Sequence, residues 1–198
     1  MTNYGLGTNL GKTVDLNEQA ARNVLEEDIV HAISEIKGET VIAYDEKKLA
    51  AAADYAAEDV LSESATDGAG TAFKFNIGKG LVRLTKAIAF CSVTALTPRV
   101  TLYLSNSPPT SEKDDNAANT APSQGDWQVF EGQLDFLGME DLGGGSSSVI
   151  TVGTYGNLPL DVVAGVDGYI YGIAVTRDAI TGEAAGMLLG FKLVGKRI

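Results

Sequence analysis

The side chains best suited to acid–base chemistry or metal binding are scarce in this sequence. His31 is the only histidine, and Glu27 and Glu35 lie four residues before and after it. The three could form an acid–base pair or bind a metal ion, but pairs with this spacing are also ordinary on a solvent-exposed helix face. We favour the solvent-exposed face, because a single histidine does not build a multi-histidine metal site within one chain.

The single cysteine, Cys91, excludes an internal disulfide and any multi-cysteine metal site. It lies in the apolar run AIAFCSV, and no histidine in that half of the chain is available to activate it as a nucleophile. We therefore expect a buried, unreactive thiol.

Acidic residues offer two further candidate sites. EKDDNAAN, at 112–119, contains carboxylates and asparagines of the kind that bind calcium, but it lacks the spacing and closing glutamate of an EF-hand. We expect a solvated loop there. Glu131 and Asp135 alternate on one strand face and could serve as paired carboxylates for glycoside hydrolysis, as could many surface positions. We predict a protein that is not an enzyme, with no cofactor and no metal.

The N-terminal stretch GLGTNLGKT, at residues 5–13, ends as a phosphate-binding P-loop does. That motif requires a glycine where Leu6 stands and a strand before the loop, and only four residues precede the stretch. We instead expect a glycine-rich arm over 1–14. Its apolar residues Tyr4, Leu6 and Leu10 either contact a neighbouring subunit or belong to a disordered terminus.

The chain is strongly acidic, and the charge is unevenly distributed. Its 198 residues include 15 basic and 26 acidic ones, a net charge of −11. Residues 1–70 hold 14 acidic and 5 basic residues, and residues 71–198 hold 12 and 10. This balance argues against nonspecific binding to nucleic acid or an anionic membrane. With no membrane-length apolar run and no signal sequence, we expect synthesis in a reducing compartment.

Two helices are predicted to precede a β-domain. The first spans 15–37, with a capping box at Asp15 and Glu18 and one apolar stripe. The second spans 45–64, and its stripe is made mainly of alanine. The two stripes consist of Ala21, Leu25, Ile29, Ile33 and Ile36 in the first, and Leu49, Ala52, Ala53, Ala56, Val60 and Leu61 in the second. A helix pair this thin must pack against the β-domain or another subunit.

The period of the apolar pattern changes to two near residue 68, which predicts about eight short antiparallel strands. The expected fold class is therefore α+β: the arm, a helical segment at 15–67, and a β-sandwich at 68–198 that is jelly-roll-like or another Greek key. The strands are expected at 71–77, 81–93, 98–104, 127–138, 149–155, 158–163, 168–175 and 186–194. Long polar loops at 105–126 and 138–148 separate some of them.

Basic and aromatic residues of the β-domain are candidate binding groups. Basic residues Lys74, Lys79, Arg83 and Lys86 lie near Phe73 and Phe75. Alternation places these charges in solvent and the rings in the core, so we do not expect nucleic-acid binding. Tyr169 and Tyr171 share a strand face and could stack on a sugar or belong to a core or subunit interface.

An arm, an acidic helix, an alanine-rich helix and a nearly neutral β-domain together resemble the capsid cement or decoration proteins of tailed bacteriophages. The resemblance implies a non-enzymatic virion protein on the capsid exterior, made in the host cytoplasm. It implies binding to the major capsid protein and to copies of itself, as a dimer or trimer. The contacts would then come from Tyr4, Leu6, Leu10, Leu49, Ala53, Ala56 and Val60.

The alternative is a carbohydrate- or receptor-binding module of a virion fibre or a bacterial surface protein. Recognition would then come from the loops at 105–126 and 138–148, with Trp127, Tyr169 or Tyr171 stacking on sugar. An enzyme is a third interpretation, and it requires a carboxylate pair in a cleft.

Overall fold

The computed structural model describes residues 38–50, 54–93, 97–181 and 186–198. The chain divides into two compact units, Met1–Glu39 and Thr40–Ile198, and every described strand belongs to the second. The arm and the helix predicted at 15–37, His31 included, lie outside the described residues. No helix in the described part of the chain is long and apolar enough to cross a membrane.

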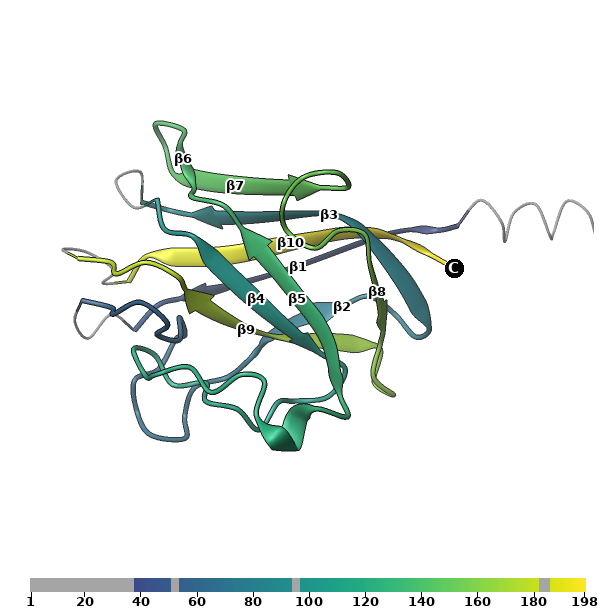
Figure 1. Ribbon diagram of the computed structural model, residues 1–198, viewed down its shortest axis with the longest axis horizontal. Helices are drawn as coiled ribbons and strands as arrows, with labels where there is room; N and C mark the ends of the chain where they lie inside the picture. Colours follow the sequence, from purple (N-terminus) through teal and green to yellow (C-terminus); the bar gives the residue numbers. More distant parts are fainter. Residues whose placement is uncertain (1–37, 51–53, 94–96, 182–185) are drawn as a thin grey trace, which may run out of the picture. The chain divides into compact units, whose positions relative to one another are not determined.

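The second unit is a sandwich of two antiparallel β-sheets (Figure 1). The strands of the larger sheet are β1 (Thr40–Lys48), β3 (Leu81–Cys91), β6 (Glu140–Asp141), β7 (Ser146–Thr151), β8 (Leu160–Val163) and β10 (Leu188–Arg197). Those of the smaller sheet are β2 (Phe73–Asn76), β4 (Val100–Ser105), β5 (Phe130–Phe136) and β9 (Tyr169–Thr176). The orders are β1-β10-β3-β7-β6, with β8 also beside β3, and β2-β9-β4-β5.

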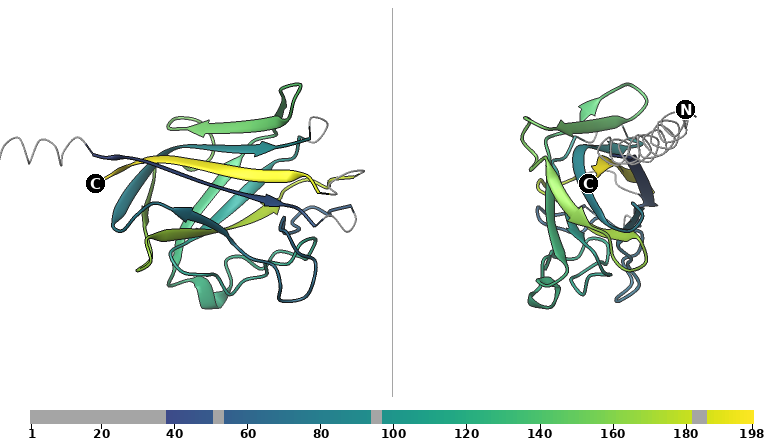
Figure 2. Two further views of the ribbon diagram at one scale, coloured as in Figure 1. Left: turned by 180° about the vertical axis from the view of Figure 1, so that it is seen from behind. Right: turned by 90° about the vertical axis from the view of Figure 1, so that its right-hand side faces the viewer.

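The pairing of the strands is nested. β1 pairs with β10, β2 with β9, β3 with β8 and β4 with β5, so early strands meet late ones and the innermost pair is adjacent in sequence. A long antiparallel ribbon rolled into a sandwich, as in a jelly roll, has this pattern. The short β6–β7 hairpin is not one of these nested pairs. It pairs with the second half of β3 and so extends the larger sheet on that side. In Figures 1 and 2 this hairpin and the loop with the 3₁₀ turn η1 (Gln124–Asp126) lie at opposite margins of the sandwich.

Aromatic side chains join the two sheets in the core. Alternation along β10 turns Phe191 inward, and alternation along β2 and β5 does the same for Phe73 and Phe136. The Phe191 ring meets Phe73 edge to face at 5.0 Å between centroids and Phe136 at 5.5 Å. All three rings are fully buried, so a ring from the larger sheet lies between two from the smaller sheet.

The predicted β-sandwich is confirmed, but the α+β class is wrong for the described residues, which are almost entirely β. The helix predicted at 45–64 is absent from the described residues of that range, 45–50 and 54–64. Its first residues, 45–48, belong to β1, and residues 58–61 run beside the second half of β9. There the N–H of Glu58 donates to the carbonyl of Thr176 at 2.8 Å.

Tertiary contacts explain why the helical pattern at 45–64 does not decide the structure. β2 covers only the first half of β9, so the second half offers unpaired backbone groups to residues 58–61. Leu49 and Val60 are fully buried in this extended arrangement. An alanine stripe on a lone helix would bury much less area, and helix propensity is a weak preference that such burial overrides.

Candidate interaction surface

The outer faces of the two sheets differ in how they are covered. On the smaller sheet, Ile173 and Val175 of β9 point outward but are buried, because Val60 packs on them and Tyr103 and Ala121 adjoin. The larger sheet keeps several apolar side chains in solvent on its outer face. They include Ile42 and Tyr44 of β1 and Val149 of β7, which are 58%, 49% and 49% exposed.

Strand register places these side chains in one continuous patch. Tyr44 of β1 lies opposite Lys192 of β10, which lies opposite Ile88 of β3, which lies opposite Val149 of β7. The neighbouring row runs from Ile42 through Val194 to Lys86. We call the outer side of the larger sheet at Ile42, Tyr44, Lys86, Ile88, Phe90, Val149, Lys192 and Val194 the open face.

A pair of aromatic rings forms a flat part of the open face. Tyr44 and Phe90 stack with their centroids 5.6 Å apart and their planes 11° apart. They come from β1 and β3, on the two sides of β10, where Gly190 lies directly opposite Phe90. A Cβ atom at Gly190 would lie 2.1 Å from the Cζ atom of Phe90, so the stack requires glycine at this position.

The charges on the open face are mainly basic. The Arg83 guanidinium, at its margin, binds the Asp161 carboxylate in a bidentate pair at 2.7 and 2.8 Å. Lys86 and Lys192 form no ion pair with any described residue. Their ammonium groups therefore remain available to a partner.

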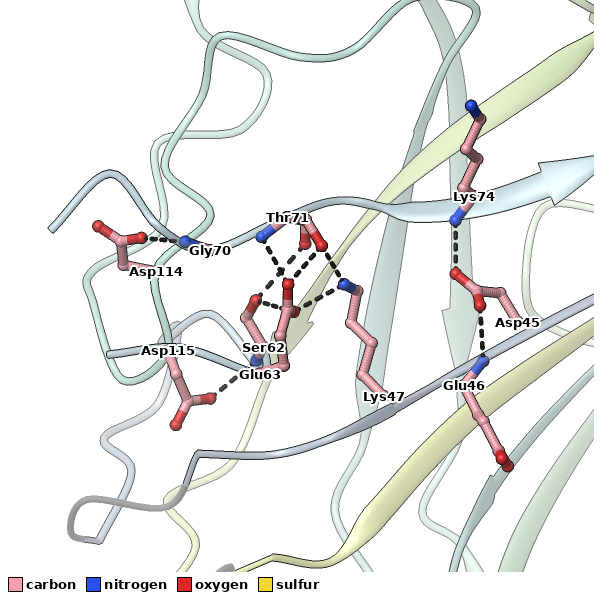
Figure 3. A network of polar contacts seen from close by, with 10 residues as sticks. All are labelled: Asp45, Glu46, Lys47, Ser62, Glu63, Gly70, Thr71, Lys74, Asp114 and Asp115. Carbon is pink, nitrogen blue, oxygen red and sulfur yellow. Dashed lines mark hydrogen bonds and ion pairs between the residues drawn. The ribbon is translucent and has the colours of Figure 1, made fainter. Parts of the chain in front are cut away.

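The long loop at 105–126 is held in place by buried carboxylates, contrary to the expected solvated loop at 112–119. The Asp114 carboxylate accepts the backbone N–H groups of Gly68 and Gly70 at 2.6 and 2.7 Å, the second of which Figure 3 shows. These bonds lower the pKa of Asp114. Asp115 accepts the Tyr55 hydroxyl and the N–H of Ser62. The described residues contain no group of ligands that could hold a metal ion.

Asp126 anchors the other end of the same loop. Its carboxylate accepts the N–H and hydroxyl groups of Thr110 and Ser111 and the hydroxyl of Ser123. Burial alone would raise the pKa of Asp126, but these hydrogen bonds outweigh burial and lower it. A small hollow beside it is lined by Tyr103, Pro109, Phe130 and others. Because the Asp126 carboxylate accepts five hydrogen bonds from its own loop, its role is to hold that loop in place.

The structure does not bring Glu131 and Asp135 together. They lie four residues apart on β5, which is about 13 Å along an extended strand. Each has its own partners: Asp135 accepts the hydroxyl of Thr101 at 2.7 Å, and Glu131 accepts the N–H of Val163 at 2.9 Å. Glycosidases place their two carboxyl groups about 5 to 9.5 Å apart, so this pair does not fit that chemistry.

The three candidate sugar-stacking aromatics lie in different environments. Tyr171 is buried, and its hydroxyl donates to Asp167 at 2.5 Å. The Lys74 ammonium lies 4.0 Å from the ring centre of Tyr169. Tyr169 and Tyr171 therefore make contacts within the chain, whereas Trp127 is 66% exposed.

The other predicted site residues lie mostly in the core or outside the described part of the chain. Leu49 and Val60 are buried and Ala56 is exposed. Ala53 and the arm residues Tyr4, Leu6 and Leu10 lie outside the described residues. Of the basic cluster, Lys79 and Lys86 are exposed, and the neighbouring Phe73 and Phe75 are buried, as alternation predicts.

The lone thiol is buried as well. Cys91 lies with its sulfur 3.4 Å from that of Met187. Burial raises the pKa of the thiol, which keeps it protonated and unreactive at neutral pH.

Sequence reasoning missed the open face, and the run VIAY at 41–44 carried the signal. Its alternation, continued by DEKK, is that of an edge strand with Ile42 and Tyr44 on one side. Comparison with models of known protein families gives no match, and comparison with curated proteins gives none either.

Proposed function

We propose that this chain is a non-enzymatic structural protein that binds and stabilises the capsid shell of a tailed bacteriophage, as cement and decoration proteins do. The observation that carries the proposal is the open face. A sandwich with one sheet covered by its own loops and the other left apolar and exposed has a surface suited to a protein partner.

The rigid loops support the same proposal. Asp114, Asp115 and Asp126 each accept backbone N–H groups, so the covered side of the sandwich is held by internal bonds. The open face would then contact the shell, and its strands are held in place by their packing on the core. Sites on strands are held more precisely than sites on loops, and a protein that spans shell subunits needs that precision.

The test is quantitative mass spectrometry of particles sedimented from the source. We expect this chain in hundreds of copies per particle, in a fixed ratio to the major shell protein. A few copies would place it instead at a vertex, fibre or tail. Its absence from particles would refute the proposal.

The second candidate, a carbohydrate- or receptor-binding module, is favoured by one observation, the exposure of Trp127 next to the η1 turn. An exposed indole is a common stacking surface for sugars. If this candidate is correct, Trp127→Ala abolishes binding to a glycan array while leaving attachment to particles unchanged.

A further inference from the structure

We propose that the open face binds an acidic protein surface, with Lys86 and Lys192 pairing with carboxylates of the partner while the apolar side chains around them are buried. This inference rests on the proposed function, and it names the chemistry of the partner. It assigns the contact to strands β1, β3, β7 and β10.

The charge of the open face differs from that of the rest of the chain. The chain has a net charge of −11, yet lysines outnumber the unpaired carboxylates on the outer side of the larger sheet. Asp161 pairs with Arg83, and the carboxylates of Glu46 and Glu140 lie at the two ends of the cross-strand row through Phe90. Lys86 and Lys192 are left without an acidic partner among the described residues. Lys86 and Lys192, together with Lys48 and Lys196 on the same side of the sheet, outnumber Glu46 and Glu140, so the local charge is positive on an acidic molecule.

The two lysines lie among the apolar side chains of the open face. Lys192 has Tyr44 and Ile88 as its cross-strand neighbours, and Lys86 has Val194 as its neighbour on β10. The aliphatic part of each side chain can lie along these apolar neighbours while the ammonium group faces outward. A partner that covers the apolar residues must therefore also meet the two charges, and carboxylates meet them best.

The open face suits a protein partner better than a polyanion. A nucleic acid or an anionic membrane carries negative charge over its whole surface and would be repelled by the acidic remainder of the chain, whereas a protein partner can confine its carboxylates to the area opposite the two lysines. It would also leave Ile42 and Val149, which are about half exposed, against phosphate or water. A protein surface with apolar side chains among its carboxylates would cover the apolar side chains of the open face and also pair with its two lysines.

The experiment uses the full chain and particles of the source from which this protein has been stripped. Lys86→Glu is compared with Lys79→Glu, which makes the same change of charge at an exposed lysine in the β2–β3 turn. Binding is measured by co-sedimentation at low and high salt, and circular dichroism checks the fold of each variant. We expect Lys86→Glu to weaken binding at least ~10-fold and Lys79→Glu to change it less than ~2-fold. Raising the salt concentration should reduce the difference in particle binding between Lys86→Glu and Lys79→Glu.

The outcomes separate the inference from the function on which it rests. If wild-type protein does not bind particles, the proposed function fails and the inference fails with it. If wild-type and both variants bind equally, the function stands and the inference is overturned. A change in the mass of free Lys86→Glu in analytical ultracentrifugation would assign the face to a second copy instead. Tight wild-type binding to a DNA duplex or to phosphatidylserine vesicles, lost in Lys86→Glu, would equally overturn it.

Discussion

Replacing Glu63 with glutamine tests how the polar network in Figure 3 stabilises the fold. Lys47 of β1 is nearly buried, with 8% of its side chain exposed, and its ammonium group binds the Glu63 carboxylate at 2.6 Å. Ser62 and Thr71 also donate to that carboxylate. Burial alone would raise the pKa of Glu63, but these bonds outweigh it and lower the pKa from 4.5 to about 2.

The expected magnitude follows from linkage. Because the folded pKa lies below the unfolded one, Glu63 contributes stability above pH 4.5 and loses it as the pH falls toward 2. A shift of this size corresponds to about 3 kcal/mol at neutral pH. Between pH 7 and pH 3.5, about 1.4 kcal/mol of that contribution is lost.

The assay is urea unfolding of wild-type protein and Glu63→Gln at pH 7, 5 and 3.5. We expect the variant to be less stable by roughly 2–3 kcal/mol at pH 7, and the gap to narrow by about 1.4 kcal/mol at pH 3.5. Glu140→Gln, at an exposed acid on β6, serves as the control and should follow wild type. If the difference in the free energy of unfolding between wild type and Glu63→Gln stays constant with pH, the stabilising role given to the Lys47–Glu63 ion pair is refuted.

Three further predictions concern packing and burial. Gly190→Ala places a Cβ against the Phe90 ring and should cost about 1–3 kcal/mol, whereas Gly144→Ala meets open space and should change stability by less than about 0.5 kcal/mol. In a Phe90→Ala background the cost of Gly190→Ala should disappear, and equal costs in both backgrounds would contradict the stack as its cause. Asp115→Ala leaves the Tyr55 hydroxyl and the Ser62 N–H without their acceptor and should lower the free energy of unfolding in urea by about 2–4 kcal/mol; a loss below about 1 kcal/mol would count against its buried role. Trp127→Ala should leave the melting temperature within about 2 °C of wild type, because the side chain is largely exposed, and a larger drop would show hidden packing.

Most strands of the β-domain could be predicted because they contain their own signal, whereas β6 and the start of β7 lie in the stretch at 138–148 that was expected to be a loop. Alternation placed strands at 98–104 and 168–175, and the structure has them at Val100–Ser105 and Tyr169–Thr176. The same alternation identified Phe73 as a core residue. These patterns depend only on which side of a strand is buried, and that is local information.

The rest depended on contacts between distant parts of the chain. Residues 45–64 have a helical pattern, but the free edge of β9 and the core decide their structure, and neither is visible in that stretch. The carboxylate of Asp114 binds backbone groups of Gly68 and Gly70 across the fold. The local sequence of 112–119 does not indicate those distant partners. The sequence therefore predicts a solvated loop where the structure has a buried carboxylate.

The central claim is that the open face is the surface by which this protein attaches to a shell. Hydroxyl-radical footprinting of the free and particle-bound chain tests it most directly, because Tyr44 of the open face and Trp127 near η1 are both exposed and reactive aromatic residues. We expect Tyr44 to become protected on the particle while Trp127 keeps its reactivity. Protection of Trp127 with Tyr44 unchanged would contradict the account and assign attachment to the loops.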